Sequence, residues 1–287
     1  INTYCWLVVQ FAELEKKTSK IKVFTENKTG WTKLEKQAYD KLYEVEEKHW
    51  YHDACRKLVD VYLKKIKEEL PYDLNILDVG CGTGGMFGVL HKYGNVTGLE
   101  VSEYAINLCR KKYPEINIIN ESAKNLRMLF KKETFDVIAF FNVLYHKDIE
   151  DDVGILKDAY TILKPFGYVI LYEPAFKCLY RRNDRICHGV RRYSRNDIRR
   201  AMDIVGFNLV ANTYFNSVSF FPVLILKWIE LFENYNKGKE ITELKLPSKI
   251  VNYVMMKIMS FERLWIRLFK DVPFGTSVFS LVRKGYG

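Results

Sequence analysis

A carboxylate at the end of an apolar run stands directly before a cluster of glycines. Residues 76–85 read Ile-Leu-Asp-Val-Gly-Cys-Gly-Thr-Gly-Gly. Glycine lets the backbone take unusual conformations and lets a ligand lie against bare main chain. The helix expected after this loop would add unpaired N–H groups at its first turn. The segment therefore predicts a strand–turn–helix whose ligand site is formed by Asp78, Gly80, Cys81, Gly82 and Gly84.

A second carboxylate, Glu100, ends the next apolar run, 20 residues after Gly80. In a βαβ unit this is where a carboxylate accepts hydrogen bonds from the two hydroxyls of a ribose. Gly80, Gly82 and Gly85 also satisfy the dinucleotide pattern G-x-G-x-x-G, which leaves an NAD(P)-linked oxidoreductase as an alternative. Asp78 weighs against it, because a carboxylate at the mouth of the loop repels a diphosphate and attracts an ammonium group.

The whole loop resembles motif I of the class I S-adenosylmethionine-dependent methyltransferases, and Glu100, Val101 and Ser102 continue a similar pattern. The resemblance implies that S-adenosyl-L-methionine is the cofactor. It also implies methylation by SN2 displacement at the sulfonium methyl group, with no metal. A transferase acting on a small or lipid-linked acceptor is the function that we expect from it.

Two later segments resemble further parts of the same family. Ser122 and Ala123 stand where the family has a G-D-A sequence, with serine in place of the aspartate that binds adenine. Asn142 to His146 resembles the family segment D-V-L-E-H. The resemblance implies that Ser122, Ala123 and Asn142 contact the cofactor and that Tyr145 and His146 face the acceptor. A neutral imidazole at His146 could remove a proton, and a packing role stays open.

Alternating apolar runs and helical patterns predict an α/β fold. We expect a Rossmann-like, doubly wound sheet of seven strands, mostly parallel, whose last strand runs antiparallel as in the resembled family. The strands are predicted at residues 75–79, 96–100, 116–120, 135–141, 168–173, 207–215 and 277–283. The predicted domain organisation is an extension of unknown role at 1–33, a helical cap at 34–72, the methyltransferase domain at 73–216 and 276–287, and a helical insertion at 217–275.

The cap contains the sequence Glu46-x-x-His49-Trp50-Tyr51. Many small-molecule methyltransferases of the class I family carry a similar leader that covers the cofactor pocket. The resemblance implies that Trp50 and Tyr51 contact the substrate, and the alternative is that both are ordinary core residues.

The charge is unevenly distributed along the chain. The formal net charge is +10, and residues 176–203 hold nine Lys or Arg against three Asp. Arginine binds phosphates and carboxylates well, so Arg191, Arg192 and Tyr193 are candidates for contacts with an anionic acceptor. A solvated basic surface is the alternative. The concentration of charge in one segment does not favour nucleic acid as the partner.

The insertion is rich in apolar helical patterns near 219–232 and 249–268. Helices of this kind could cover an apolar acceptor, lie on a membrane surface, or form a small core of their own. A non-catalytic module that binds membrane or RNA is therefore a further alternative. Six cysteines without a C-x-x-C pair predict neither a zinc site nor disulfides and favour a cytoplasmic protein. The apolar helices of the insertion allow peripheral contact with a membrane, and no sequence feature indicates an oligomeric state.

Overall fold

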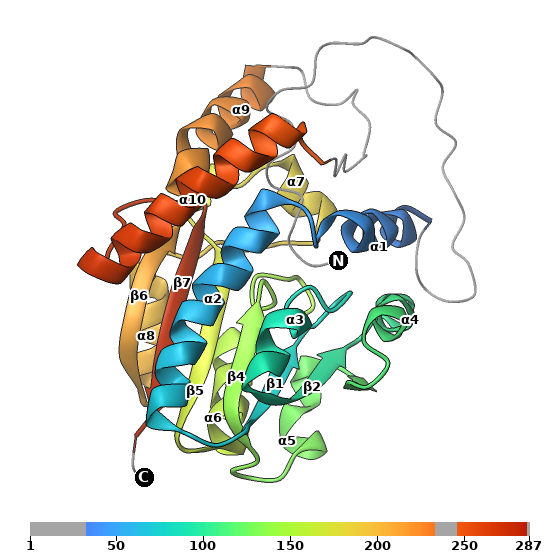
Figure 1. The fold of residues 1–287 in the computed structure, drawn as a ribbon, viewed down its shortest axis with the longest axis vertical. Helices are drawn as coiled ribbons and strands as arrows, with labels where there is room; N and C mark the ends of the chain where they lie inside the picture. The colour runs from blue at the N-terminus through green and yellow to red at the C-terminus, as the bar shows by residue number, and fades with distance from the viewer. Residues whose placement is uncertain (1–32, 233–245, 286–287) are drawn as a thin grey trace.

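A twisted seven-stranded sheet forms the centre of the molecule (Figure 1). The computed structural model describes residues 33–232 and 246–285. The strand order is β3-β2-β1-β4-β5-β7-β6, and only β7 runs antiparallel to its neighbours, β5 and β6. The strands are β1 (Leu74–Val79), β2 (Gly94–Glu100), β3 (Asn117–Asn120), β4 (Phe135–Phe141), β5 (Leu163–Pro174), β6 (Phe207–Phe215) and β7 (Ser277–Lys284). The predicted Rossmann-like sheet with an antiparallel last strand is confirmed.

Helices cover both faces of the sheet, because the central strands are apolar on both sides. Every residue of β4 is buried, as expected for a parallel strand between two helical layers. One face packs against α2 (Trp50–Glu69), α3 (Phe87–Leu90) and α4 (Glu103–Lys112). The other face packs against α5 (Leu126–Leu129), α6 (Asp152–Ile162) and α8 (Arg195–Val205).

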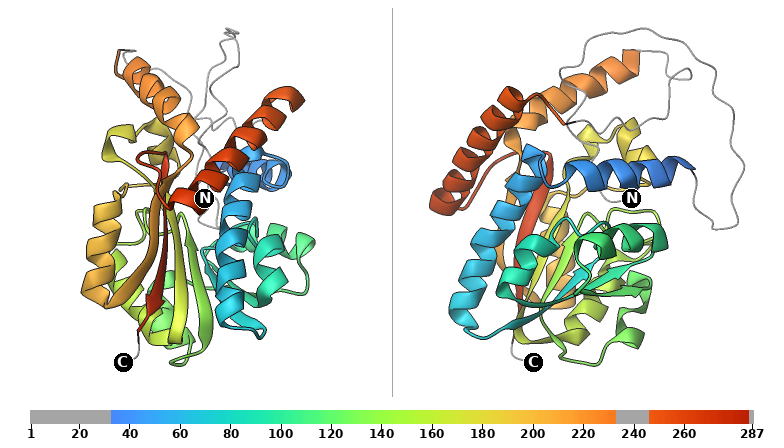
Figure 2. Two further views of the ribbon diagram at one scale, coloured as in Figure 1. Left: turned by 60° about the vertical axis from the view of Figure 1, so that its left-hand side comes forward. Right: turned by 45° about the vertical axis from the view of Figure 1, so that its right-hand side comes forward.

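The remaining helices gather at the end of the molecule where the parallel strands finish. Figure 2 shows α1 (Lys33–Val45), α7 (Arg182–Ile186), α9 (Phe220–Phe232) and α10 (Lys249–Phe269) at this end. Short 3-10 turns complete the described chain: η1 (His91–Tyr93), η2 (Ala123–Asn125), η3 (Lys177–Leu179) and η4 (Ser217–Ser219). In open α/β sheets ligands bind at this edge, near the point where the strand order reverses, which here lies between β1 and β4.

Two elements differ from the sequence prediction. The helical pattern between the predicted strands at 116–120 and 135–141 forms only the short turn η2 followed by one turn of α5. Strand β5 begins at Leu163 rather than at residue 168, because Leu163 already pairs with Phe135. Phe166 takes a left-handed φ of 63° in this stretch. The predicted extension at 1–33 lies, except for Lys33, outside the described residues, and the proposed domain boundaries stay a prediction.

Helix α10 is fastened to the sheet by a buried carboxylate. Glu262 accepts hydrogen bonds from the backbone N–H of Asn216 at 2.6 Å and of Ser217 at 3.0 Å, and from the Ser217 hydroxyl at 2.6 Å. Burial raises the pKa of Glu262, and these hydrogen bonds act in the opposite direction. Both N–H groups belong to the turn between β6 and α9, so one side chain sets where both helices leave the sheet.

We predict that Glu262→Ala lowers the free energy of unfolding by about 2–3 kcal/mol, because buried N–H groups lose a charged acceptor. Glu262→Gln should lose less, since its amide oxygen still accepts. Glu68→Ala, at an exposed position on α2, serves as the control and should change little. Urea denaturation measures all three, and an alanine variant as stable as the control would contradict the fastening role.

Candidate cofactor and acceptor site

The loop after β1 presents an open main-chain surface. Gly80, Gly82 and Gly84 all have left-handed φ values, of 69°, 56° and 82°. The Gly80 N–H donates to the Leu99 carbonyl at 2.7 Å, which ties the loop to the end of β2. A Cβ atom placed on Gly82 would meet no atom within 4 Å. The loop therefore requires glycine for its backbone shape and leaves space beside it for a ligand.

Asp78 lies under this loop with a carboxylate oxygen that has no hydrogen-bond partner. The residue is 1% exposed, and Oδ1 accepts no hydrogen bond from the described residues. Burial, and next the charge of Glu100, raise the pKa of Asp78 well above its ordinary value. Buried polar atoms almost always have partners in proteins, so this oxygen marks the place of a donor supplied by a ligand. A cationic donor such as an ammonium group suits it best.

Glu100 links the loop to the following helix. One carboxylate oxygen accepts the Gly82 N–H at 2.9 Å, and the other accepts the Ser102 N–H at 2.9 Å. Each oxygen keeps a further lone pair, so the fixed carboxylate can still accept from two neighbouring hydroxyls. Val101, beside it, is about half exposed. This arrangement agrees with the ribose contact predicted for Glu100.

The helical cap contacts the glycine loop through Glu46. The Thr83 hydroxyl donates to Glu46 at 2.7 Å, and Lys112 pairs with the other carboxylate oxygen at 2.5 Å. Arg56 donates to the Glu46 carbonyl at 2.9 Å and to the Gly85 carbonyl at 3.4 Å. Glu46 lines the same pocket as Asp78, Gly80, Gly82 and Phe141. The sequence marked Glu46 as part of the leader motif but gave no sign of its contact with Thr83.

The other predicted cofactor residues lie at the same edge. Ser122 caps η2 by accepting from the Lys124 N–H at 3.2 Å, and Ala123 is buried beside it. Asn142 follows β4 with a left-handed φ of 59°, and its N–H donates to Tyr172. Cys81 is buried in the loop and lines the pocket. Their contacts with the cofactor stay predictions.

The turn after β4, which carries His146, is held by Glu173. This fully buried carboxylate at the end of β5 accepts three consecutive N–H groups, from Val143 at 3.0 Å, Leu144 at 2.9 Å and Tyr145 at 3.3 Å. Burial raises the pKa of Glu173 to about 8, although the three hydrogen bonds act in the opposite direction. The sequence indicates only that Glu173 reaches the ligand edge. Its role in shaping the turn is visible in the structure alone.

His146 lies at the partly exposed end of this turn. Its side chain is 18% exposed, and burial lowers its pKa to about 4. Nδ1 accepts from the Asp148 N–H at 3.3 Å. Nδ1 also lies 3.3 Å from the Asp148 carboxylate. A hydrogen on Nδ1 would donate to that carboxylate and leave Nε2 able to remove a proton, whereas a hydrogen on Nε2 would make Nε2 a donor that orients the acceptor.

Tyr145 and Tyr193 point into the protein beneath the turn. The Tyr145 hydroxyl donates to the Cys187 carbonyl at 3.4 Å. The Tyr193 hydroxyl contacts Asp152 at 2.7 Å and the Leu144 carbonyl at 3.0 Å. Arg191 donates to the same carbonyl at 3.2 Å. These contacts support the turn from below, and a direct role of Tyr145, Tyr193 or Arg191 in the reaction stays a prediction.

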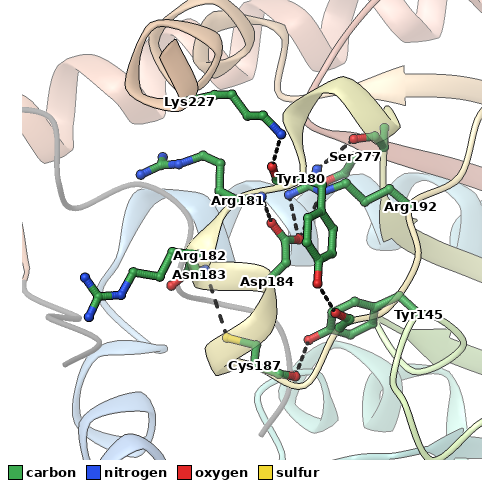
Figure 3. Close-up of polar contacts among 12 residues, drawn as sticks. Tyr145, Tyr180, Arg181, Arg182, Asn183, Asp184, Cys187, Arg192, Lys227 and Ser277 are labelled. Carbon is green, nitrogen blue, oxygen red and sulfur yellow. Dashed lines mark hydrogen bonds and ion pairs between the residues drawn. The ribbon is translucent and has the colours of Figure 1, made fainter. Parts of the chain in front are cut away.

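Arg192 has its charge compensated inside the protein (Figure 3). The guanidinium is fully buried, donates to Asp184 at 2.9 Å and donates to the Ala175 carbonyl at 2.7 Å. Since a buried arginine paired in this way is expensive to separate from its carboxylate, the geometry favours a structural role over the predicted contact with an anionic acceptor.

Trp50 and Tyr51 are both buried at the start of α2. The backbone N–H of Trp50 donates to the side-chain oxygen of Asn252 in α10 at 2.9 Å. The Tyr51 hydroxyl accepts from Tyr172 at 3.0 Å and lies 3.4 Å from the Ser277 hydroxyl. The two residues connect the cap, the sheet and α10, which agrees with the core alternative. Their predicted substrate contacts remain untested.

We predict that His146 stays neutral down to about pH 5, because burial lowers its pKa to about 4. NMR of ¹⁵N-labelled histidine side chains measures the titration midpoint and shows which ring nitrogen carries the hydrogen, and His146→Gln assigns the signal by its disappearance. The urea-unfolded protein, in which histidine titrates near pH 6.5, provides the comparison. A midpoint near pH 6.5 in the folded protein would contradict the burial of the ring.

Comparison with known proteins relates this chain to methyltransferases. Residues 77–171 match the family model described as "Methyltransferase domain". The ubiquinone/menaquinone biosynthesis C-methyltransferase UbiE of Campylobacter jejuni is 28% identical over 132 residues, which are 43% of this chain and 52% of that protein. The demethylmenaquinone methyltransferase of Chlorobaculum tepidum is 33% identical over 119 residues, covering 40% and 47% of the two chains. The chain thus spans about half the length of the curated relatives that it matches.

Solved structures agree on the fold. A SAM-dependent methyltransferase from Archaeoglobus fulgidus has a TM-score of 0.50 at 18% identity and covers 80% of this chain and 94% of its own. The plantazolicin methyltransferase BamL has a TM-score of 0.52 at 12% identity, with 87% and 91% covered. At these identities the likeness concerns the fold alone.

The residues around the glycine loop fit S-adenosylmethionine as the cofactor. Asp78 offers a buried oxygen without a hydrogen-bond partner, and the glycine loop beside it leaves open space. Glu100 offers two fixed carboxylate oxygens at the end of β2, the position where a βαβ unit binds a ribose. The chain therefore carries a class I S-adenosylmethionine-dependent methyltransferase domain.

Proposed function

We propose that the protein transfers the methyl group of S-adenosylmethionine to a small or lipid-linked acceptor with an apolar body. The observation that carries this proposal is the buried, unpartnered carboxylate oxygen of Asp78 beside the glycine loop. An amino acid's ammonium group satisfies this oxygen, whereas the diphosphate of NAD(P) would be repelled by it. The oxidoreductase alternative therefore loses its support from the geometry.

The residues of the chain bind and orient the reactants. Asp78 holds the ammonium group, and Glu100 accepts from the ribose hydroxyls. The cofactor itself supplies a methyl group on a sulfonium leaving group, so the protein's task is alignment and exclusion of water. Glu173 fixes the turn that carries His146, and Nε2 of His146 can form a hydrogen bond with the acceptor.

The acceptor class is inferred from the relatives and from the helices at the site edge. The two curated relatives named above have names that refer to ubiquinone or menaquinone compounds. A sterol 24-C-methyltransferase of Clavispora lusitaniae is also similar, at 25% identity over 160 residues, which are 50% of this chain and 42% of that protein. Quinones and sterols are largely apolar. The exposed apolar residues of α9 and α10 support an acceptor of similar character and contact with a membrane surface. RNA has no comparable support.

We predict that Asp78→Asn weakens S-adenosylmethionine binding by about 1.5–3 kcal/mol, roughly 10- to 150-fold in Kd, because a charged hydrogen bond is lost. The free variant should be as stable as the wild type or more stable, since an unpartnered buried carboxylate costs free energy. Calorimetry and urea denaturation measure the two effects. Asp73→Asn, at the exposed opposite end of the same strand region, is the control. Unchanged affinity in Asp78→Asn would refute the assignment.

A second prediction concerns the acceptor. With methyl-labelled cofactor, we expect label in a prenylated demethylquinone, a sterol or a lipid-linked saccharide, and none in RNA. A tail-less analogue of the accepted compound should show a lower kcat/KM, because the apolar contacts are missing. Asp78→Asn at limiting cofactor is the negative control. Efficient methylation of RNA, or of the tail-less analogue alone, would contradict the proposal.

A further inference from the structure

Helix α10 presents a continuous apolar stripe to solvent. Residues spaced three or four apart share one side of a helix. The stripe consists of Ile250, Val254, Ile258, Phe261, Trp265 and Leu268. All six are exposed; Ile250, Phe261 and Leu268 reach 78%, 66% and 64%. Single exposed apolar residues are ordinary on protein surfaces, but a stripe that follows a helix for its whole length indicates a contact.

Another side of α10 packs against the protein core. Met259 and Ile266 are buried in the core on the α2 side of the sheet. Glu262, on the same side, holds the turn before α9. The exposed stripe cannot turn inward without breaking these contacts. It is therefore a fixed surface that faces away from the sheet.

Helix α9 repeats the arrangement. Phe221, Ile225 and Ile229 lie on exposed positions at helical spacing, while Val223 is buried. Polar contacts fasten α9 from the other side: Lys227 donates to the Tyr180 carbonyl (Figure 3), and Glu230 accepts from Arg181 at 2.9 Å. Two fastened helices thus expose apolar residues at the end of the molecule that carries the cofactor loop (Figure 2).

The exposed charges on these helices are positive. Lys249, Lys257 and Arg267 are exposed on α10. The acidic residues of the two described helices, Glu230 and Glu262, both bind groups of the protein itself. Within the described residues, no helix is long and apolar enough to cross a membrane. An apolar stripe flanked by cations is the pattern of a helix that lies in the interface of an anionic bilayer.

We propose that α10, together with α9, docks the protein on the surface of an anionic lipid bilayer. Phe261 and its neighbours in the stripe would enter the boundary between head groups and acyl chains, while the three cations contact lipid phosphates. The inference rests on the proposed function in one respect only: the membrane would be the source of the apolar acceptor. Its test needs no methyl transfer, so the two proposals can fail separately.

The test is co-sedimentation with vesicles of phosphatidylcholine alone or mixed with phosphatidylglycerol. The wild type should bind the mixed vesicles, bind neutral ones far more weakly, and lose binding as salt rises. Replacing Ile250, Phe261 and Leu268 with serine should abolish binding. Replacing Lys249, Lys257 and Arg267 with glutamine should weaken it by roughly a hundredfold, at about a fivefold loss for each cation.

A matched control removes equally exposed apolar residues elsewhere: Met128, Ile204 and Val210 are replaced with serine. This variant should bind vesicles like the wild type, and circular dichroism checks that all variants are folded. Equal binding by the stripe and control variants would overturn the proposal. A second outcome would also overturn it: the wild type binds no vesicles but forms dimers in analytical ultracentrifugation, and the stripe substitutions dissociate these dimers. The stripe would then contact a second copy of the chain.

Discussion

Buried carboxylates that bind main-chain N–H groups determine the shape of the functional end of this protein. Glu100 holds Gly82 and Ser102, Glu173 holds three consecutive residues after β4, and Glu262 holds the turn before α9. Turns at the edge of a sheet have few backbone partners of their own, so a charged acceptor from a neighbouring element fixes them strongly. Asp78 is different, because one of its oxygens has no such partner. The surrounding turns keep it buried, and a ligand must satisfy it.

This difference connects stability with function. A carboxylate that is buried without a donor opposes folding, and proteins retain such groups mainly where a ligand uses them. In this protein the unfavourable free energy of the buried Asp78 carboxylate arises next to the glycine loop. The cap contacts the same loop through the hydrogen bond between Thr83 and Glu46. Binding of a cationic ligand would therefore stabilise the loop, the end of β1 and the cap contact together.

The fold was largely predictable, because apolar runs separated by helical patterns define a parallel sheet and because the loop at residues 76–85 has a specific sequence. The contacts of charged residues were not. Arg192 appears in the sequence as part of a basic segment, yet its partner Asp184 lies in a separate short helix and removes it from solvent. Glu173 and Glu262 are single acidic residues in apolar surroundings, and their N–H partners lie 28 to 46 residues away in the chain. Such pairings depend on three-dimensional register, which local sequence does not encode.

The central claim is that Asp78 receives the ammonium group of the cofactor. Because burial raises the pKa of Asp78 well above its ordinary value, a cation that binds there must lower this pKa and release a proton. Calorimetry of S-adenosylmethionine binding at several pH values between 4 and 8, in buffers with different ionisation enthalpies, counts the protons released. We expect a net release in the wild type that is absent from Asp78→Asn. Binding without proton release in the wild type, or the same release in both proteins, would contradict the claim.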